Sequence, residues 1–81
     1  MSTPGISVMI TSPERVLFEG IAQSVTFPGE QGTFEVQLLH RPLVSRLLAG
    51  LVVVDGRALA IRRGVVRVAA DVVTAVVDPR E

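Results

Sequence analysis

The chain reads Leu51-Val52-Val53-Val54-Asp55-Gly56-Arg57-Ala58-Leu59-Ala60-Ile61 near its middle, and this stretch decides its fold. An Asp-Gly pair stands between two apolar runs, and the tightest hairpin turns need a positive φ at both central positions, which Asp and Gly tolerate. The valines around the pair are β-branched, and such side chains suit a pleated surface. The stretch therefore predicts two antiparallel strands joined by a two-residue turn.

Similar short segments extend from this hairpin in both directions. Toward the amino terminus, alternation of apolar and polar residues predicts strands near 6–10, 15–19, 21–27 and 33–38. Toward the carboxy terminus, Gly64 is expected to end one strand, and a second hairpin is expected to join 65–68 to 72–77. Residues 42–50 fit a short helix or a strand, because Leu43, Leu47 and Leu51 also have helical spacing, but the short length favours a strand or a single turn.

These segments predict an all-β fold, an antiparallel β-sandwich or flattened barrel of about 8–10 short strands. A chain of 81 residues has room for one domain. We expect a flexible amino terminus at 1–5, the sandwich at 6–78 and a polar tail at 79–81. The aromatic residues Phe18, Phe27 and Phe34 stand where core residues are expected.

Composition excludes several classes of function. Eight acidic and eight basic side chains cancel, which argues against a nucleic-acid binder held by its net charge. The absence of lysine excludes lipoyl and biotinyl carrier domains, which attach their cofactor to a lysine. The longest strongly apolar run, residues 47–54, is far shorter than the about 20 residues of a membrane-spanning helix. We therefore expect no direct membrane insertion.

The inventory of catalytic side chains is small. His40 is the single histidine, and cysteine, lysine and tyrosine are absent. A Ser-His-Asp set that uses His40 stays open, because such a triad is defined by geometry. A metal site of His40 with Glu30 or Glu35 lacks a recognised ligand spacing. We predict no catalytic residue, no cofactor, no cofactor-binding residue and no metal site, and hence no enzyme activity of the chain alone.

Charge is unevenly distributed along the chain. Between residues 41 and 67, Asp55 is the single acid among six arginines. These arginines are either part of a solvated surface or a basic face for an acidic partner, since arginine pairs well with carboxylates. The second case describes a free-standing β-sandwich protein-binding module. The arginines are Arg41, Arg46, Arg57, Arg62, Arg63 and Arg67.

Four motifs occur in an order that resembles a known family. Ser12-Pro13-Glu14-Arg15-Val16-Leu17-Phe18-Glu19-Gly20 is followed by Val25-Thr26-Phe27-Pro28-Gly29-Glu30-Gln31-Gly32-Thr33-Phe34 and by His40-Arg41-Pro42-Leu43, a His-x-Pro-Leu motif. The last hairpin comprises Gly64-Val65-Val66-Arg67-Val68 and Asp71-Val72-Val73-Thr74-Ala75-Val76-Val77-Asp78. Over about residues 6–78 the chain resembles the amino-terminal β-sandwich domain of the epsilon subunit of F-type ATP synthases, in a short form without a carboxy-terminal helical hairpin.

The sequence also departs from that family. Leu38 and Leu39 stand where members often have Pro-Gly, and Arg63-Gly64 stands where they often have two glycines. Many members continue into a helical hairpin, whereas this sequence stops at Glu81. We expect weaker or no contact with the alpha and beta subunits without that hairpin.

The resemblance implies a non-catalytic central-stalk, or rotor, subunit that links the gamma subunit to the membrane c-ring and helps couple ion transport to ATP synthesis. It implies a peripheral location at the cytoplasmic face of the energy-transducing inner membrane. The implied loop facing the c-ring consists of Gly29, Glu30, Gln31, Gly32 and Thr33. The implied partner contacts are His40, Arg41, Pro42 and Leu43, and His40 is also expected to form a hydrogen bond with backbone near Pro42.

Overall fold

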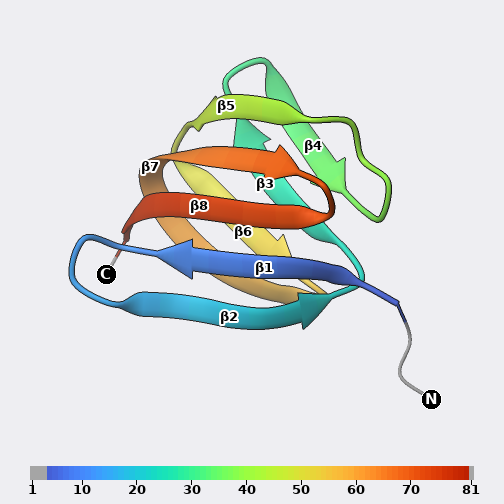
Figure 1. Ribbon diagram of the computed structural model, residues 1–81. Coiled ribbons are helices and arrows are strands. Elements are labelled where there is room, and N and C mark those ends of the chain that lie inside the picture. The colour runs from blue at the N-terminus through green and yellow to red at the C-terminus, as the bar shows by residue number, and fades with distance from the viewer. Residues whose placement is uncertain (1–3, 81) are drawn as a thin grey trace.

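Strands account for all the regular structure in residues 4–80, the part of the chain that this computed structural model describes (Figure 1). The predicted all-β fold is therefore confirmed. Residues 1–3 of the expected flexible amino terminus, and Glu81, lie outside the described residues. The strands are β1 (Ile6–Thr11), β2 (Val16–Ala22), β3 (Val25–Gly29), β4 (Gly32–Val36), β5 (Leu43–Leu47), β6 (Gly50–Val54), β7 (Arg57–Ala69) and β8 (Val72–Pro79).

The strands form two layers that share β7. One layer runs in the order β2, β1, β8, β7, β5, and the other contains β4, β3, β6 and the first part of β7. A single pairing between Gly29 and Leu47 joins β3 to β5 at the open side. Because β7, β5, β3 and β6 are connected in a closed circuit, the sandwich is also a flattened barrel, as Figure 1 shows.

A bulge in β7 allows one strand to serve both layers. The first five residues of β7 pair with β6, and its later residues pair with β5 and β8. The register to β8 shifts between Ile61 and Arg63, so that Arg62 is an extra residue. One extra residue moves the following side chains to the opposite face. Ile61 is buried before the bulge, and Val66 and Val68 are buried after it.

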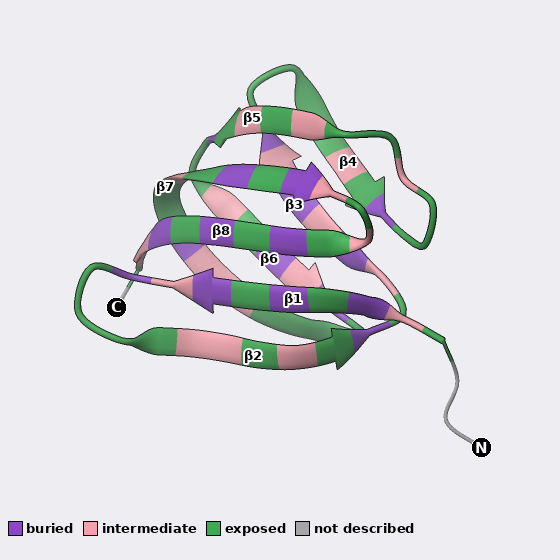
Figure 2. Cartoon of the chain, viewed as in Figure 1, coloured by how far each residue is buried: buried purple, intermediate pink, exposed green. Residues whose placement is uncertain are grey.

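The core consists of alternate residues from both layers. Figure 2 shows buried and exposed positions alternating along β1 and β8. Phe27 is fully buried at the centre, while Phe18 and Phe34 pack against the core from its margin, which confirms the core positions expected for the aromatic residues. The buried apolar residues are Ile6, Val8, Ile10, Ala22, Val25, Phe27, Val36, Leu47, Val52, Val54, Ile61, Val66, Val68, Val73, Ala75 and Val77.

Both predicted hairpins are present. Asp55 and Gly56 have φ values of 45° and 85°, and Ala70 and Asp71 have values of 51° and 60°, as two-residue hairpin turns require. The Asp55 carboxylate also accepts hydrogen bonds from the backbone N–H groups of Gln23 and Ser24, each at 3.0 Å. The turn between β6 and β7 thereby holds the connection between β2 and β3.

One detail of the sequence prediction was wrong. Gly64 does not end a strand but lies inside β7, where it faces Val77 of β8. Strands β1 and β8 form a parallel pair, whereas the other strand pairs in residues 4–80 are antiparallel, as predicted for the sandwich. A parallel pair needs a long crossover connection, which the intervening strands supply here.

The structure also shows the conformation of residues 42–50, for which the sequence allowed a helix or a strand, and of the segment near the carboxy terminus. Residues 43–47 form strand β5, in agreement with the short strand favoured over a helix. The polar tail expected at 79–81 begins inside β8, which extends to Pro79, and the Arg80 N–H donates to the Ala60 carbonyl at 2.9 Å. No helix in residues 4–80 is long and apolar enough to cross a membrane.

Replacement of Gly64 by alanine should destabilise the fold. A Cβ atom at this position would lie 2.7 Å from the Val76 carbonyl oxygen and 3.1 Å from the Val77 Cα atom, both backbone atoms of β8. Since backbone can yield only by separating the strands, we expect Gly64→Ala to lower the free energy of unfolding by about 2 kcal/mol, measured by urea denaturation.

Gly20→Ala is the matched control for this prediction. The atom nearest to a Cβ at Gly20 is Phe18 Cζ at 3.7 Å, an ordinary contact, so the free energy of unfolding should change by at most about 0.5 kcal/mol. Equal effects of the two substitutions would contradict the close approach of β7 and β8 at Gly64.

Asp55→Ala should destabilise the fold through the turn between β6 and β7. The substitution removes the acceptor for Gln23 and Ser24 and places alanine at a positive φ. We expect a loss of about 2 kcal/mol in the free energy of unfolding. Asp55→Asn keeps one oxygen acceptor and tolerates this φ, so it should lose less than half as much in the same denaturation experiment. A wild-type urea midpoint for Asp55→Ala would show that the carboxylate contributes nothing.

Candidate partner-binding site

The loop of residues 29–33 is the tip of the hairpin between β3 and β4. Gly29 pairs with Gly32, and Glu30 and Gln31 form the turn between them. A Cβ on Gly29 would lie 2.7 Å from the Phe34 ring and 2.8 Å from the Gly32 carbonyl oxygen. Gly32 has a φ of 123°, which a residue with a side chain rarely adopts. The glycines therefore allow a tight tip that presents polar side chains to solvent.

The second predicted segment, residues 40–43, follows a bend after β4. The His40 N–H donates to the Gln37 carbonyl at 3.2 Å, which closes a turn before the histidine. The His40 Nδ1 atom lies 2.7 Å from the Arg41 carbonyl oxygen. Because a carbonyl can only accept, Nδ1 carries the proton in this hydrogen bond. This bond agrees with the expected backbone contact of His40 near Pro42.

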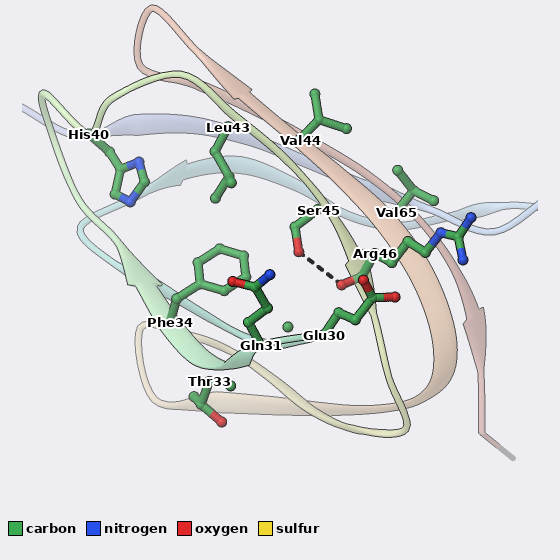
Figure 3. A pocket seen from close by; sticks show the side chains of 12 residues that line it. Glu30, Gln31, Thr33, Phe34, His40, Leu43, Val44, Ser45, Arg46 and Val65 are labelled. Carbon is green, nitrogen blue, oxygen red and sulfur yellow. Dashed lines mark hydrogen bonds between the residues drawn. The ribbon is translucent and has the colours of Figure 1, made fainter.

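The two segments meet at one depression of about 670 Å³ (Figure 3). All five residues of the 29–33 loop line it, together with His40 and Leu43. Arg41 and Pro42 are exposed and do not belong to its lining. The structure therefore unites the predicted loop with two of the four predicted partner contacts, across the space between the β3–β4 tip and β5.

Further lining residues were not foreseen from the sequence. They come from β4, β5 and β7, and β5 and β7 are brought beside the loop by the pairing of Gly29 with Leu47. No local pattern reveals that pairing, because the partners are separated by two turns and a strand. The additional residues are Phe34, Val44, Ser45, Arg46 and Val65.

The depression offers an apolar floor with polar groups at its rim. Phe34, Leu43 and Val65 supply apolar surface, while Glu30 supplies a carboxylate and Arg46 a guanidinium group. Figure 3 shows Glu30 and Arg46 at the same end of the depression. An apolar centre with a polar rim is the usual composition of a protein–protein contact. The arrangement is suited to recognition of a protein loop.

A second depression of about 650 Å³ continues from the first. The two share Glu30, Arg46 and Val65, and the second also reaches Val76 of β8. An ion pair between Arg63 and Asp78, with 3.8 Å between nitrogen and oxygen, lies at its far end. The Arg63 side chain is 82% exposed and that of Asp78 is 44% exposed, so solvent screens the pair and it contributes little to stability. The accessible surface thus forms a furrow from the β3–β4 tip to β8.

The six arginines of residues 41–67 are not all gathered on one face, although Arg46 and Arg63 both line the second depression. Arg57 opens β7, and Arg67 lies ten residues further along the same strand, up to roughly 33 Å away at about 3.3 Å per residue. Arg41 lies outside the strands, in the connection to β5. The alternative function as an arginine-rich module for an acidic partner gains no support from this arrangement.

The described residues also contain no cluster suited to metal chemistry. Within residues 4–80, no group of three or more histidine, aspartate or glutamate side chains is placed to hold a metal ion. His40 contacts backbone through Nδ1, and the hydroxyl of Ser45, which lines the same depression, donates to the Arg46 carbonyl at 2.9 Å.

Comparison with known proteins identifies the family. The family described as "ATP synthase, Delta/Epsilon chain, beta-sandwich domain" matches residues 5–81. The ATP synthase epsilon chain of Nitratiruptor sp. is 37% identical over 78 residues, which cover 90% of this chain and 60% of the relative. That of Sulfurovum sp. is 39% identical over 74 residues, which cover 85% of this chain and 58% of the relative. The chain thus spans less than two thirds of the length of these relatives.

Solved structures share the fold at lower sequence identity. A chain of the Tetrahymena thermophila mitochondrial ATP synthase, in a structure of its central stalk and c-ring, has a TM-score of 0.76 and 14% identity, and the match covers 96% of this chain and 66% of that one. A chain of the Euglena gracilis mitochondrial ATP synthase has a TM-score of 0.82 and 20% identity, with coverages of 95% and 53%. From the match over residues 5–81, the chain belongs to the family of the β-sandwich domain of ATP synthase delta and epsilon chains.

Proposed function

We propose that this chain is a non-catalytic central-stalk subunit of an F-type ATP synthase, which links the gamma subunit to the membrane c-ring. The observation that carries the proposal, beside the family membership, is the single depression that joins the 29–33 loop to His40 and Leu43. The resemblance in sequence implied a partner role for both segments separately. A shared binding site requires that the 29–33 loop and the 40–43 segment lie on one surface, and both line this depression.

The build of the sandwich is suited to a part that transmits torque. Its core runs through both layers, and β7 connects the layers without a break. Close-packed protein interiors have low compressibility, so a load applied at one surface reaches the other instead of being absorbed. In the proposed role, the chain helps to couple ion transport to ATP synthesis mechanically and takes no part in the chemistry of ATP.

The 29–33 loop is the part that we assign to the c-ring. Glu30, Gln31 and Thr33 are exposed at the β3–β4 tip, and polar side chains suit contact with loops that project from a membrane into water. The chain would then be peripheral at the cytoplasmic face of the energy-transducing membrane, held there by protein contacts. A chain of the same fold occurs in the structure of the central stalk and c-ring of the Tetrahymena thermophila mitochondrial ATP synthase, which supports a place in such a complex.

Reversing the charge of Glu30 should weaken assembly. Glu30 lies in the turn of the loop and lines both depressions, so Glu30→Arg changes charge and bulk at the proposed contact. We expect the dissociation constant for a purified complex of gamma and c-ring to rise about tenfold, measured by surface plasmon resonance. Thermal unfolding should be unchanged, because the side chain is exposed.

Glu19→Arg provides the matched control, since Glu19 is an exposed glutamate in β2, away from the depression. Its dissociation constant should stay within about twofold of wild type. A wild-type chain that binds neither gamma nor the c-ring would overturn the proposed function. Equal weakening by Glu19→Arg and Glu30→Arg would overturn the assignment of the site.

A further inference from the structure

One layer of the sandwich has an apolar outer face. The layer of β2, β1, β8, the later part of β7 and β5 lies toward the viewer in Figure 2, where exposed bands alternate with buried ones along β1 and β8. The side of a sheet that faces water normally carries polar side chains. A contiguous apolar patch on such a face marks an interaction site. The large apolar side chains that lie beside one another here, each between 37% and 69% exposed, are Met9, Ile21, Val44, Val65, Val72 and Val76.

A row of directly paired residues across this face carries opposite charges at its two ends. Glu19 of β2 pairs with Met9 of β1. Thr74 of β8 pairs with Met9 on one side and with Arg67 of β7 on the other. Strand spacings of about 4.8 Å place Glu19 and Arg67 roughly 14 Å apart, and neither forms an ion pair within residues 4–80. The midpoint of the row lies between β1 and β8.

This row is complementary to a second copy of itself. Two identical sheet faces can pack on each other about a two-fold axis that lies in the contact plane and runs along the strands. When the axis passes between β1 and β8, β2 of each copy lies over β7 of the other. Glu19 then faces Arg67 of the second copy at both ends of the row. In the adjacent row, Val76 faces Thr11, which carries a methyl group. The charges thus pair between copies, around an apolar centre.

We propose that this face binds a second copy of the same chain, so that the free chain forms a two-fold symmetric dimer. The charged row identifies the occupant, because its pattern is complementary to itself and complementary charges set the partner and register of an interface. The chain has eight acidic and eight basic side chains, so no net charge repels one copy from the other.

The size of the face sets the strength of the dimer. Four strands about 4.8 Å apart and about 20 Å long cover roughly 400 Å² in plan. Stable complexes bury about 800 Å² on each partner, so the dimer should be weak, with a dissociation constant of about 50 µM. Val65 lines both depressions, so the dimer and the central-stalk assembly would compete for part of one surface. This competition rests on the proposed function, whereas the dimer itself does not.

An exchange of charge between β2 and β7 tests the dimer. Sedimentation equilibrium should show the weight-average mass of the wild-type chain rising from 8.7 kDa toward twice that value between about 5 and 500 µM. Glu19→Arg alone and Arg67→Glu alone should each raise the dissociation constant about tenfold, since like charges then face each other at both ends of the row. An equimolar mixture of the two variants should associate about as strongly as wild type, because every arginine again faces a glutamate. Recovery in the mixture separates lost charge pairing from a damaged fold.

The matched control is Arg57→Glu, the same charge reversal at an exposed arginine of β7 that pairs with β6 in the other layer. It should change the dissociation constant of the dimer by no more than about twofold. A wild-type chain that stays at 8.7 kDa up to about 500 µM would overturn the dimer. Single reversals without effect, or a mixture of them that stays monomeric, would overturn it as well.

The dimer and the proposed function can fail separately. Binding to gamma and the c-ring is measured far below the dissociation constant of the dimer, where the chain is monomeric. Glu19→Arg therefore remains a control for the depression in that experiment. A chain that dimerises but binds neither gamma nor the c-ring would overturn the proposed function alone.

Discussion

The one extra residue in β7 is the constraint on which the rest of the structure depends. The bulge at Arg62 lets a single strand bury Ile61 on one side of it and Val66 and Val68 on the other. Without the bulge, the side chains after Ile61 would point to the wrong face, and arginines would enter the core. Since β7 pairs with β5, β6 and β8, its register also decides where β5 lies. The depression exists because β5 is thereby placed beside the β3–β4 tip.

Two aspartates in hairpin turns hold distant connections in place. Asp55 accepts hydrogen bonds from the backbone between β2 and β3, and Asp71 accepts one from the bend after β4. Each aspartate also has the positive φ that its own turn requires. Aspartate thus serves both its own turn and a hydrogen bond to backbone that is remote in sequence, 32 residues away in the case of Asp71 and Leu39. In a domain with a small core, such contacts restrain loops that packing does not reach.

The surface features are consistent with the proposed role as a subunit held between partners. The polar loop tip and the furrow with its apolar floor lie side by side at β5. None of these features resembles a site for chemistry: His40 hydrogen-bonds to backbone, and the charged groups lie at the rim of the furrow. Different chemical character along one surface allows different partners to be recognised by one rigid domain.

The sequence by itself determined what depends on near neighbours in the chain. The Asp55-Gly56 turn, the hairpin around Ala70 and the alternation within each strand follow from local φ preferences and from the period of two, so the all-β fold and both hairpins were predictable. The ordered motifs likewise indicated the family. The assignment of the 29–33 loop and His40 to a binding surface stays a prediction.

Only the tertiary structure decided which strands became neighbours. Glycine often marks the end of a strand, yet Gly64 lies within β7. The reason for a glycine there is that the backbone of β8 approaches too closely for any side chain. Three further features depend on segments remote in sequence: the parallel pairing of β1 with β8, the lining of the depression by Val44 and Val65, and the hydrogen bond from the Leu39 N–H to Asp71. Local alternation specifies that a segment will pair and which side it will bury. The choice of partner depends instead on how the whole set of apolar faces packs together, which no single segment encodes.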